Sequence, residues 1–232
     1  MHTRALASTA SLYPSKAALE AAFAVARKAK IPQMPDVVLA LRQEVSRSEP
    51  DLMTASDLIE QDLAITGRLL QTINSPAFNR PSKITSVQQA AALMGVKRLS
   101  NLVSAEAINQ MLEARQPPAR VVWEAIIEEA RHMSALSHLA PSISDDEAYL
   151  FGVMHDIGSL IFTGLNAEYG AMWSLNSNST PRELLAFEKR VLGIEHPVIG
   201  FLLARHWQLP DYLGVAIHHH HTPGHLNAED PR

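Results

Sequence analysis

The chain has 232 residues, 47% of them hydrophobic and 19% charged, with a net charge of −4, a composition that fits one large folded domain or two joined lobes. The negative charge excludes a general attraction for phosphate backbones, and the best local basic pair, Lys97-Arg98, is too small to supply one, so we expect no nucleic-acid partner. The sequence contains no cysteine, which excludes disulfides and thiolate metal sites, and it lacks an apolar run of about 20 residues, so we expect no membrane span.

Helical patterns recur along the whole chain and alternating strand patterns do not, which predicts an all-α fold of roughly a dozen short helices. The first helix is predicted within residues 15–30, where apolar residues recur at helical spacing and basic residues close the segment. Two prolines, Pro32 and Pro35, then force an extended stretch, and Pro35 is well placed to start the next helix.

Later helix starts are marked by capping residues. Residues 144–147 and 180–183 each place a hydroxyl residue three positions before a glutamate, which is the pattern of a capping box. Residues 85–88 repeat the pattern with glutamine, and residues 54–57 are a weaker version of it. A further helix is expected to begin at His196-Pro197, because proline is favoured in the first helical turn.

A set of short segments, all in the expected order, carries a resemblance to a known family: IPQMP at 31–35, LIEQDLAITGRLL at 58–70, INS at 73–75, ITSVQQA at 84–90, LMGVKRL at 93–99, Trp123, FGVMHDIG at 151–158, EHPVIG at 195–200, WQLP at 207–210 and AIHH at 216–219. Over about residues 31–222 the chain resembles the HDOD (HD-related output domain) family.

The resemblance implies a two-lobed, all-α architecture with a degenerate HD-type lobe. We predict an N-terminal extension with a helix at 1–30 and an HDOD domain at 31–225, followed by a frayed tail at 226–232. Within the domain, a first helical lobe at 31–115 and an HD-like lobe at 116–225 are expected to meet at a hinge, which the Gln-Pro-Pro sequence of 116–118 favours.

His155-Asp156 is the pair that suggests chemistry. In the related HD phosphohydrolases such a pair binds a divalent ion with an upstream histidine and a downstream aspartate, and the ion activates water for attack on a phosphoester. The family's upstream histidine commonly stands two residues after the tryptophan, but here Trp123 is followed at that distance by Ala125, which cannot bind metal. We therefore predict a degenerate HD site without metal or other cofactor, in which His155 and Asp156 form a buried hydrogen-bonded pair.

Other histidines and one glutamate are further candidates for a residual cleft. The four histidines of 218–221 step by about 100° along a helix, so they cannot all face one ion, although the first and last could share a face. We name His218, His219 and Glu188 as candidates for this cleft. Glu188 is also interpreted as an ordinary glutamate that faces the solvent. His196 is interpreted as a residue of the helix cap and not as a ligand.

The function that the resemblance implies is a non-catalytic regulatory domain of bacterial signal transduction, which binds signalling proteins and possesses no activity of its own. We expect it in the cytoplasm, because the N-terminal residues lack a secretory signal, and a homo-oligomer is left open. One alternative is a metal-dependent phosphohydrolase or phosphodiesterase that uses His155 and Asp156 with His132 and Glu128 as displaced ligands. Another is a sensor that binds an anion or nucleotide near His155 and Glu188 without turnover.

Overall fold

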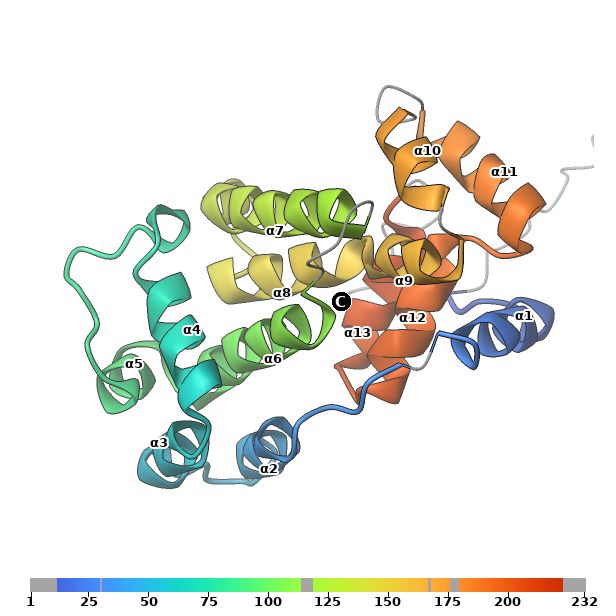
Figure 1. Cartoon of the computed structure of the whole chain (residues 1–232). Coiled ribbons are helices and arrows are strands. Elements are labelled where there is room, and N and C mark those ends of the chain that lie inside the picture. Colours follow the sequence, from blue (N-terminus) through green and yellow to red (C-terminus); the bar gives the residue numbers. More distant parts are fainter. Residues whose placement is uncertain (1–11, 30, 114–118, 167, 176–179, 223–232) are drawn as a thin grey trace, which may run out of the picture.

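The computed structural model describes residues 12–29, 31–113, 119–166, 168–175 and 180–222. All the regular secondary structure in this part of the chain is helical and it contains no strand, so the prediction of an all-α fold is confirmed (Figure 1). The helices are α1 (Lys16–Ala26), α2 (Asp36–Val45), α3 (Leu52–Glu60), α4 (Leu63–Ile73), η1 (Pro76–Phe78), α5 (Val87–Met94), α6 (Val96–Leu112), α7 (Ala119–Leu136), η2 (Ser137–Leu139), α8 (Asp145–His155), α9 (Ile157–Leu165), α10 (Tyr169–Leu175), α11 (Pro181–Leu192), α12 (His196–His206) and α13 (Asp211–His219).

Two of the predicted capping boxes are confirmed. Ser144 and Glu147 open α8, and Thr180 and Glu183 open α11 with a proline in the first turn. In each box the glutamate carboxylate accepts a hydrogen bond from the backbone N–H of the cap residue, which satisfies a donor that has no partner within the helix.

Two other predicted starts are displaced. The expected cap at Thr54 is wrong, because Asp51 begins α3 earlier and accepts hydrogen bonds from both the backbone N–H and the hydroxyl of Thr54. The box at 85–88 is shifted by one residue, since Ser86 caps α5 and the Gln89 side chain accepts from the backbone N–H of Thr85. In both cases a neighbouring side chain accepts from the backbone N–H of the expected cap residue: Asp51 from Thr54, and Gln89 from Thr85.

The centre of the molecule is formed by α6, α7 and α8, which lie side by side (Figure 1). Helices α7 and α8 pack tightly at Gly152 of α8, where a Cβ atom would lie 2.8 Å from the Cβ of Ala130 on α7 and would also overlap its backbone. The buried apolar residues form one continuous core that runs from α1 to α13. The division into two lobes remains a prediction. The predicted hinge at 116–118 and the predicted tail at 226–232 lie outside the described residues. The helix predicted near the N-terminus is α1.

The stretch Asp145–Leu165, which covers α8 and α9, is the one described segment that is long and apolar enough to cross a membrane. It is 83% buried among the other helices, as expected for the core helix of a folded domain. At its start, Arg98 forms ion pairs with Asp145 and with Asp146, whose side chain is fully buried. Arg98, half of the basic pair considered above, is therefore engaged inside the fold.

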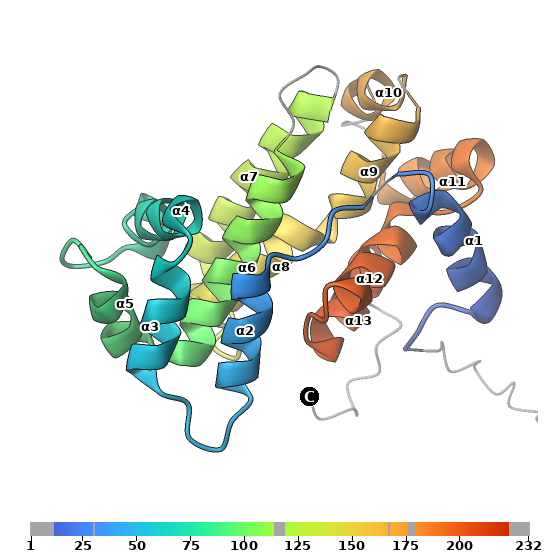
Figure 2. The same ribbon diagram turned by 60° about the horizontal axis from the view of Figure 1, so that its bottom comes forward.

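Helix α12 connects opposite parts of the structure. Its N-terminal end lies beside α9, and α1 packs along it (Figure 2). At its C-terminal end the indole N–H of Trp207 donates to the carbonyl of Pro32 at 3.0 Å. The guanidinium of Arg42 on α2 donates to the carbonyl of Gln208, whose φ of 54° is left-handed, and to the hydroxyl of Ser104. The extended segment before α2 is thus fixed to the turn after α12.

Candidate metal centre

Asp156 stands at the joint between α8 and α9. Its backbone (φ −106°, ψ 14°) leaves the helical conformation, so it ends one helix and precedes the next. Two residues later, Gly158 allows the first turn of α9 to approach the first turn of α12. A Cβ atom at 158 would lie 2.9 Å from both the Cα and the carbonyl carbon of His196. This close packing brings His196 to Asp156.

His196 is fully buried and lies between two carboxylates. Its Nε2 is 2.9 Å from Oδ1 of Asp156, and its Nδ1 is 2.8 Å from Oε2 of Glu188. Glu188, on α11, is also fully buried, and accepts hydrogen bonds from the backbone N–H of His196 at 2.8 Å and from the Tyr169 hydroxyl. The interpretations of His196 as only a cap residue and of Glu188 as a solvated side chain are therefore wrong.

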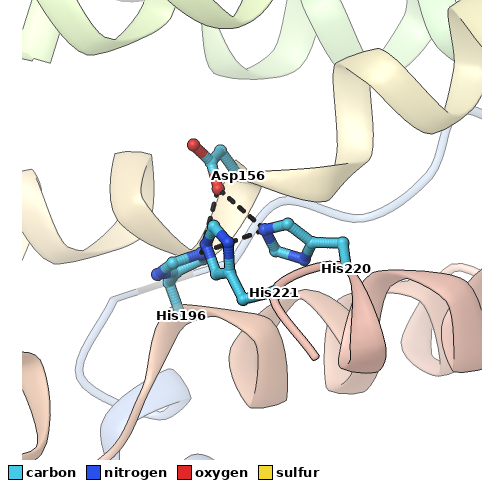
Figure 3. Close-up of side chains that lie close together, drawn as sticks. All are labelled: Asp156, His196, His220 and His221. Carbon is cyan, nitrogen blue, oxygen red and sulfur yellow. Dashed lines mark hydrogen bonds and ion pairs between the residues drawn. The ribbon is translucent and has the colours of Figure 1, made fainter. Parts of the chain in front are cut away.

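Two histidines that follow α13 complete the cluster (Figure 3). Nε2 of His220 lies 3.3 Å from Oδ1 of Asp156 and 3.4 Å from Nε2 of His196. Nε2 of His221 lies 3.0 Å from Nε2 of His196. The other ring nitrogen of His220 is 2.7 Å from the carbonyl oxygen of Ile217, so this ring is held from behind. One aspartate and three histidines from three parts of the chain thus converge.

The predicted candidates His218 and His219 are not in this cluster. His218 packs edge-on against the ring of Phe201, and His219 places its Nε2 3.2 Å from the carbonyl oxygen of Leu12. Helix α13 ends at His219, and the two histidines in the turn after it are the ones that approach Asp156 and His196.

The HD pair itself is divided between two sets of partners. The ring of His155 packs edge-on against that of His220, but its nitrogens have other partners: Nδ1 is 2.7 Å from the carbonyl oxygen of Gly152, and Nε2 is 2.9 Å from Oε2 of Glu129. Asp156 remains near it, with Oδ2 3.8 Å from Nε2 of His155. The two residues are both buried, as expected, but each has its main contacts elsewhere.

The displaced ligands considered from the sequence are not at this pair either. Glu128 and His132 are exposed on α7, and His132 lines a separate pocket beside α4. Their neighbour Glu129 reaches His155 instead, because the contact of Ala130 with α8 turns position 129 toward that helix. Helical spacing from Ala125 predicted Glu128 and His132, whereas the residue that contacts His155 is the neighbour of Glu128, at position 129.

The geometry of the four donors fits a metal ion. Oδ1 of Asp156 is buried, with Nε2 of His196 at 2.9 Å and Nε2 of His220 at 3.3 Å from it. The ligand atoms of Asp156, His196, His220 and His221 all lie within 4.8 Å of one another. In tetrahedral zinc sites, bonds of about 2.0–2.1 Å place neighbouring donors roughly 3.3 Å apart, close to the separations found here.

The surroundings of these donors also match those of metal ligands. Metal-bound histidines usually direct their second ring nitrogen to a carboxylate or a backbone carbonyl, as His196 does with Glu188 and His220 with Ile217. Burial lowers the pKa of His221 to about 4, helped by the neighbouring histidines. Its imidazole is then neutral at physiological pH, which is the form that binds metal.

Charge is concentrated at this centre. Burial by itself would lower the pKa of His196, but the charges of Asp156 and Glu188 raise it to about 10. Burial would likewise raise the pKa of Asp156, and yet His196, His220 and His155 hold it well below its usual range. Without an ion, therefore, the carboxylates hold a proton on His196. A divalent cation would supply two positive charges in place of this one.

Comparison with known proteins places this geometry in a family. The model of the HDOD domain family matches residues 31–223. A protein of Treponema pallidum (strain Nichols), described as uncharacterized, is 24% identical over 205 residues, which are 86% of this chain but 39% of that protein. The chain therefore spans about two fifths of this relative's length.

Three solved structures share the fold. An HDOD domain protein of unknown function from Geobacter sulfurreducens has a TM-score of 0.68 at 22% identity, covering 90% of this chain and 71% of its own. A protein from Shewanella amazonensis SB2B, provisionally named a phosphohydrolase, has 0.66 at 23%, covering 87% and 72%. One from Marinobacter aquaeolei VT8, provisionally named a signal transduction protein, has 0.62 at 19%, covering 93% and 53%.

At these identities the structural likeness establishes the fold alone. The family match, by contrast, covers most of the chain and includes every residue of the Asp156 centre. It also includes the helices that position them, from α8 to α13. The chain belongs to the HDOD domain family.

Proposed function

We propose that this chain is a regulatory domain of bacterial signal transduction whose HD-derived centre binds a metal ion and does not hydrolyse phosphoesters. The observation that carries the proposal is the convergence of four protein donors, Asp156, His196, His220 and His221. Structural zinc sites have four protein ligands, whereas catalytic ones have three and keep a position open for the substrate. Three imidazoles and a carboxylate suit a first-row ion such as zinc.

The burial of the centre supports a binding role. The side chain of His196 is fully buried, and those of Asp156 and His220 are 12% and 9% exposed, whereas His221 is half-buried. Three of the four donors thus offer little surface to a substrate phosphate. Position 125, where the enzymes of the superfamily carry a histidine, holds an alanine without a ligand atom.

Because most of the donors are buried, we expect the domain to act through contacts made by its surface. We propose that the partners are signalling proteins of the cytoplasm, and that the bound ion stabilises the arrangement of α9, α11, α12 and the residues after α13. Because the four donors come from three separate segments, an ion would join parts of the chain that are distant in the sequence.

The test is the metal content of the full chain, purified without a metal column and measured by mass spectrometry. We expect about one equivalent of a first-row ion per chain, retained after desalting. His220→Ala should lose it and His218→Ala should keep it. This pair is a matched control, because both residues belong to one histidine run but only His220 points to Asp156. An ion that is absent from the wild type, or equally present in both variants, would refute the metal centre.

Hydrolysis is the second candidate, and one observation favours it. Asp156 also belongs to a second group of possible ligands, with His155 and Glu129, and the Glu129 side chain is 46% exposed. A centre with two ions would show about two equivalents of metal per chain. Turnover of bis(p-nitrophenyl) phosphate that disappears in Glu129→Gln would establish this candidate and overturn the binding role.

A further inference from the structure

A separate pocket lies between α4, α6, α7 and α8, apart from the Asp156 centre. Its volume is about 490 Å³, which is within the range of small-molecule sites. The lining residues that matter here come from four helices: Arg68, Thr72, Glu106, Trp123, Arg131 and Tyr149. The pocket therefore lies where helices from the first half of the chain meet those from the second.

A buried carboxylate forms the floor of this pocket. Glu106 is 2% exposed, and its Oε1 accepts hydrogen bonds from the hydroxyls of Thr72 at 2.7 Å and Tyr149 at 2.9 Å. Within the described residues, its Oε2 accepts only from the amide of Asn109 at 3.5 Å, the limit of a hydrogen bond. Buried acceptors are normally well satisfied. This oxygen is therefore available to a donor group that enters the pocket.

The wall and the mouth offer different chemistry. The indole N–H of Trp123 donates to Oδ1 of Asn109 at 3.1 Å, which fixes its ring against the pocket. Arg131 lines the same pocket, is exposed, and forms no ion pair with any residue in the described part of the chain. One pocket thus holds a flat aromatic side chain, a buried acceptor and a guanidinium, a group that binds phosphate well.

We propose that this pocket binds a small molecule that carries a flat nitrogen heterocycle with an N–H donor at one end and a phosphate at the other, as a nucleoside 5′-monophosphate does. The heterocycle donates to Oε2 of Glu106 and lies against Trp123, and the phosphate reaches Arg131. Neither end alone uses all three features. The proposal does not depend on a metal at the Asp156 centre.

Titration calorimetry on the full chain tests this, with GMP and AMP as probes and with guanosine and inorganic phosphate as their separate parts. We expect at least one nucleotide to bind, and each separate part to bind about tenfold more weakly or worse. At roughly ten times its Kd the nucleotide should raise Tm by about 3–5 °C. Failure of both nucleotides to bind, or equal binding of inorganic phosphate, overturns the proposal.

Variants locate the site. Arg131→Gln should weaken the nucleotide by about tenfold or more, whereas Arg182→Gln, an exposed arginine on α11, should not. Glu106→Gln should weaken the nucleotide but leave phosphate unchanged. His221→Ala, which alters the metal centre, should leave the nucleotide affinity unchanged. If His221→Ala loses nucleotide binding and Arg131→Gln keeps it, the ligand binds at the Asp156 centre, and this pocket is refuted as its site.

Discussion

Replacement of Gly158 by alanine tests whether the contact between α9 and α12 holds the metal centre together. The new Cβ would lie 2.9 Å from two backbone atoms of His196 and closer still to its carbonyl oxygen. Because these are backbone atoms, no side-chain rotation relieves the overlap. The first turn of α12 must move, and His196 moves with it.

The expected magnitude follows from two opposing effects. Insertion of a methyl group into a fully packed contact costs about 1–3 kcal/mol, and a backbone overlap belongs at the upper end. Replacement of glycine by alanine within a helix returns up to about 1 kcal/mol. The net loss is about 2 kcal/mol. For a chain of this size that lowers Tm by roughly 4–8 °C.

The control lies in the same helix. A Cβ at Gly164 meets no atom within 4 Å, so Gly164→Ala should stabilise the protein by roughly 0.5–1 kcal/mol through helix propensity alone. Thermal unfolding and metal content are measured on both variants. Gly158→Ala should also lose metal, since His196 is displaced. If both variants show the same Tm and full metal, the contact does not position the centre.

Two further predictions concern buried carboxylates elsewhere. Arg98→Ala leaves Asp146 buried without its cation and should cost about 2–3 kcal/mol, whereas Arg120→Ala breaks only an exposed pair and should change stability by less than about 0.5 kcal/mol in urea unfolding. Burial raises the pKa of Glu106 above its ordinary 4.5 in spite of its hydrogen bonds. The folded state then binds the proton more tightly than the unfolded state, so the stability difference between wild type and Glu106→Gln should fall as pH rises above 4.5. A difference that grows with pH would show that the partners of Glu106 outweigh its burial.

The sequence predicted the features that depend on residues close together in the chain, such as helix starts. The capping boxes at Ser144 and Thr180 involve groups three residues apart, so the local pattern determined them. The resemblance placed His155 and Asp156 at the HD position, and both are buried there. The all-α class followed from helical spacing, which recurs wherever a helix buries one face.

The sequence could not reveal which side chains would converge. His196 looks like a helix-cap residue until α9 and α11 place Asp156 and Glu188 on either side of it. Two prior signals were available: a histidine at the start of a helix, and a histidine run that continues past the helix end. The orientation of His220 and His221 depends on where α13 stops, and helix boundaries are the least certain feature of a sequence.

Helix α12 joins two regions that the chain otherwise keeps apart. Its 11 residues make a rod of about 16 Å, with His196 at one end and, just beyond the other, Trp207, which holds the carbonyl of Pro32. A rigid helix that tilts moves at both of its ends. A change at the donors that turned the first residue of α12 would therefore also move the residue that holds the segment leading into α2, a segment that contains none of the four donors.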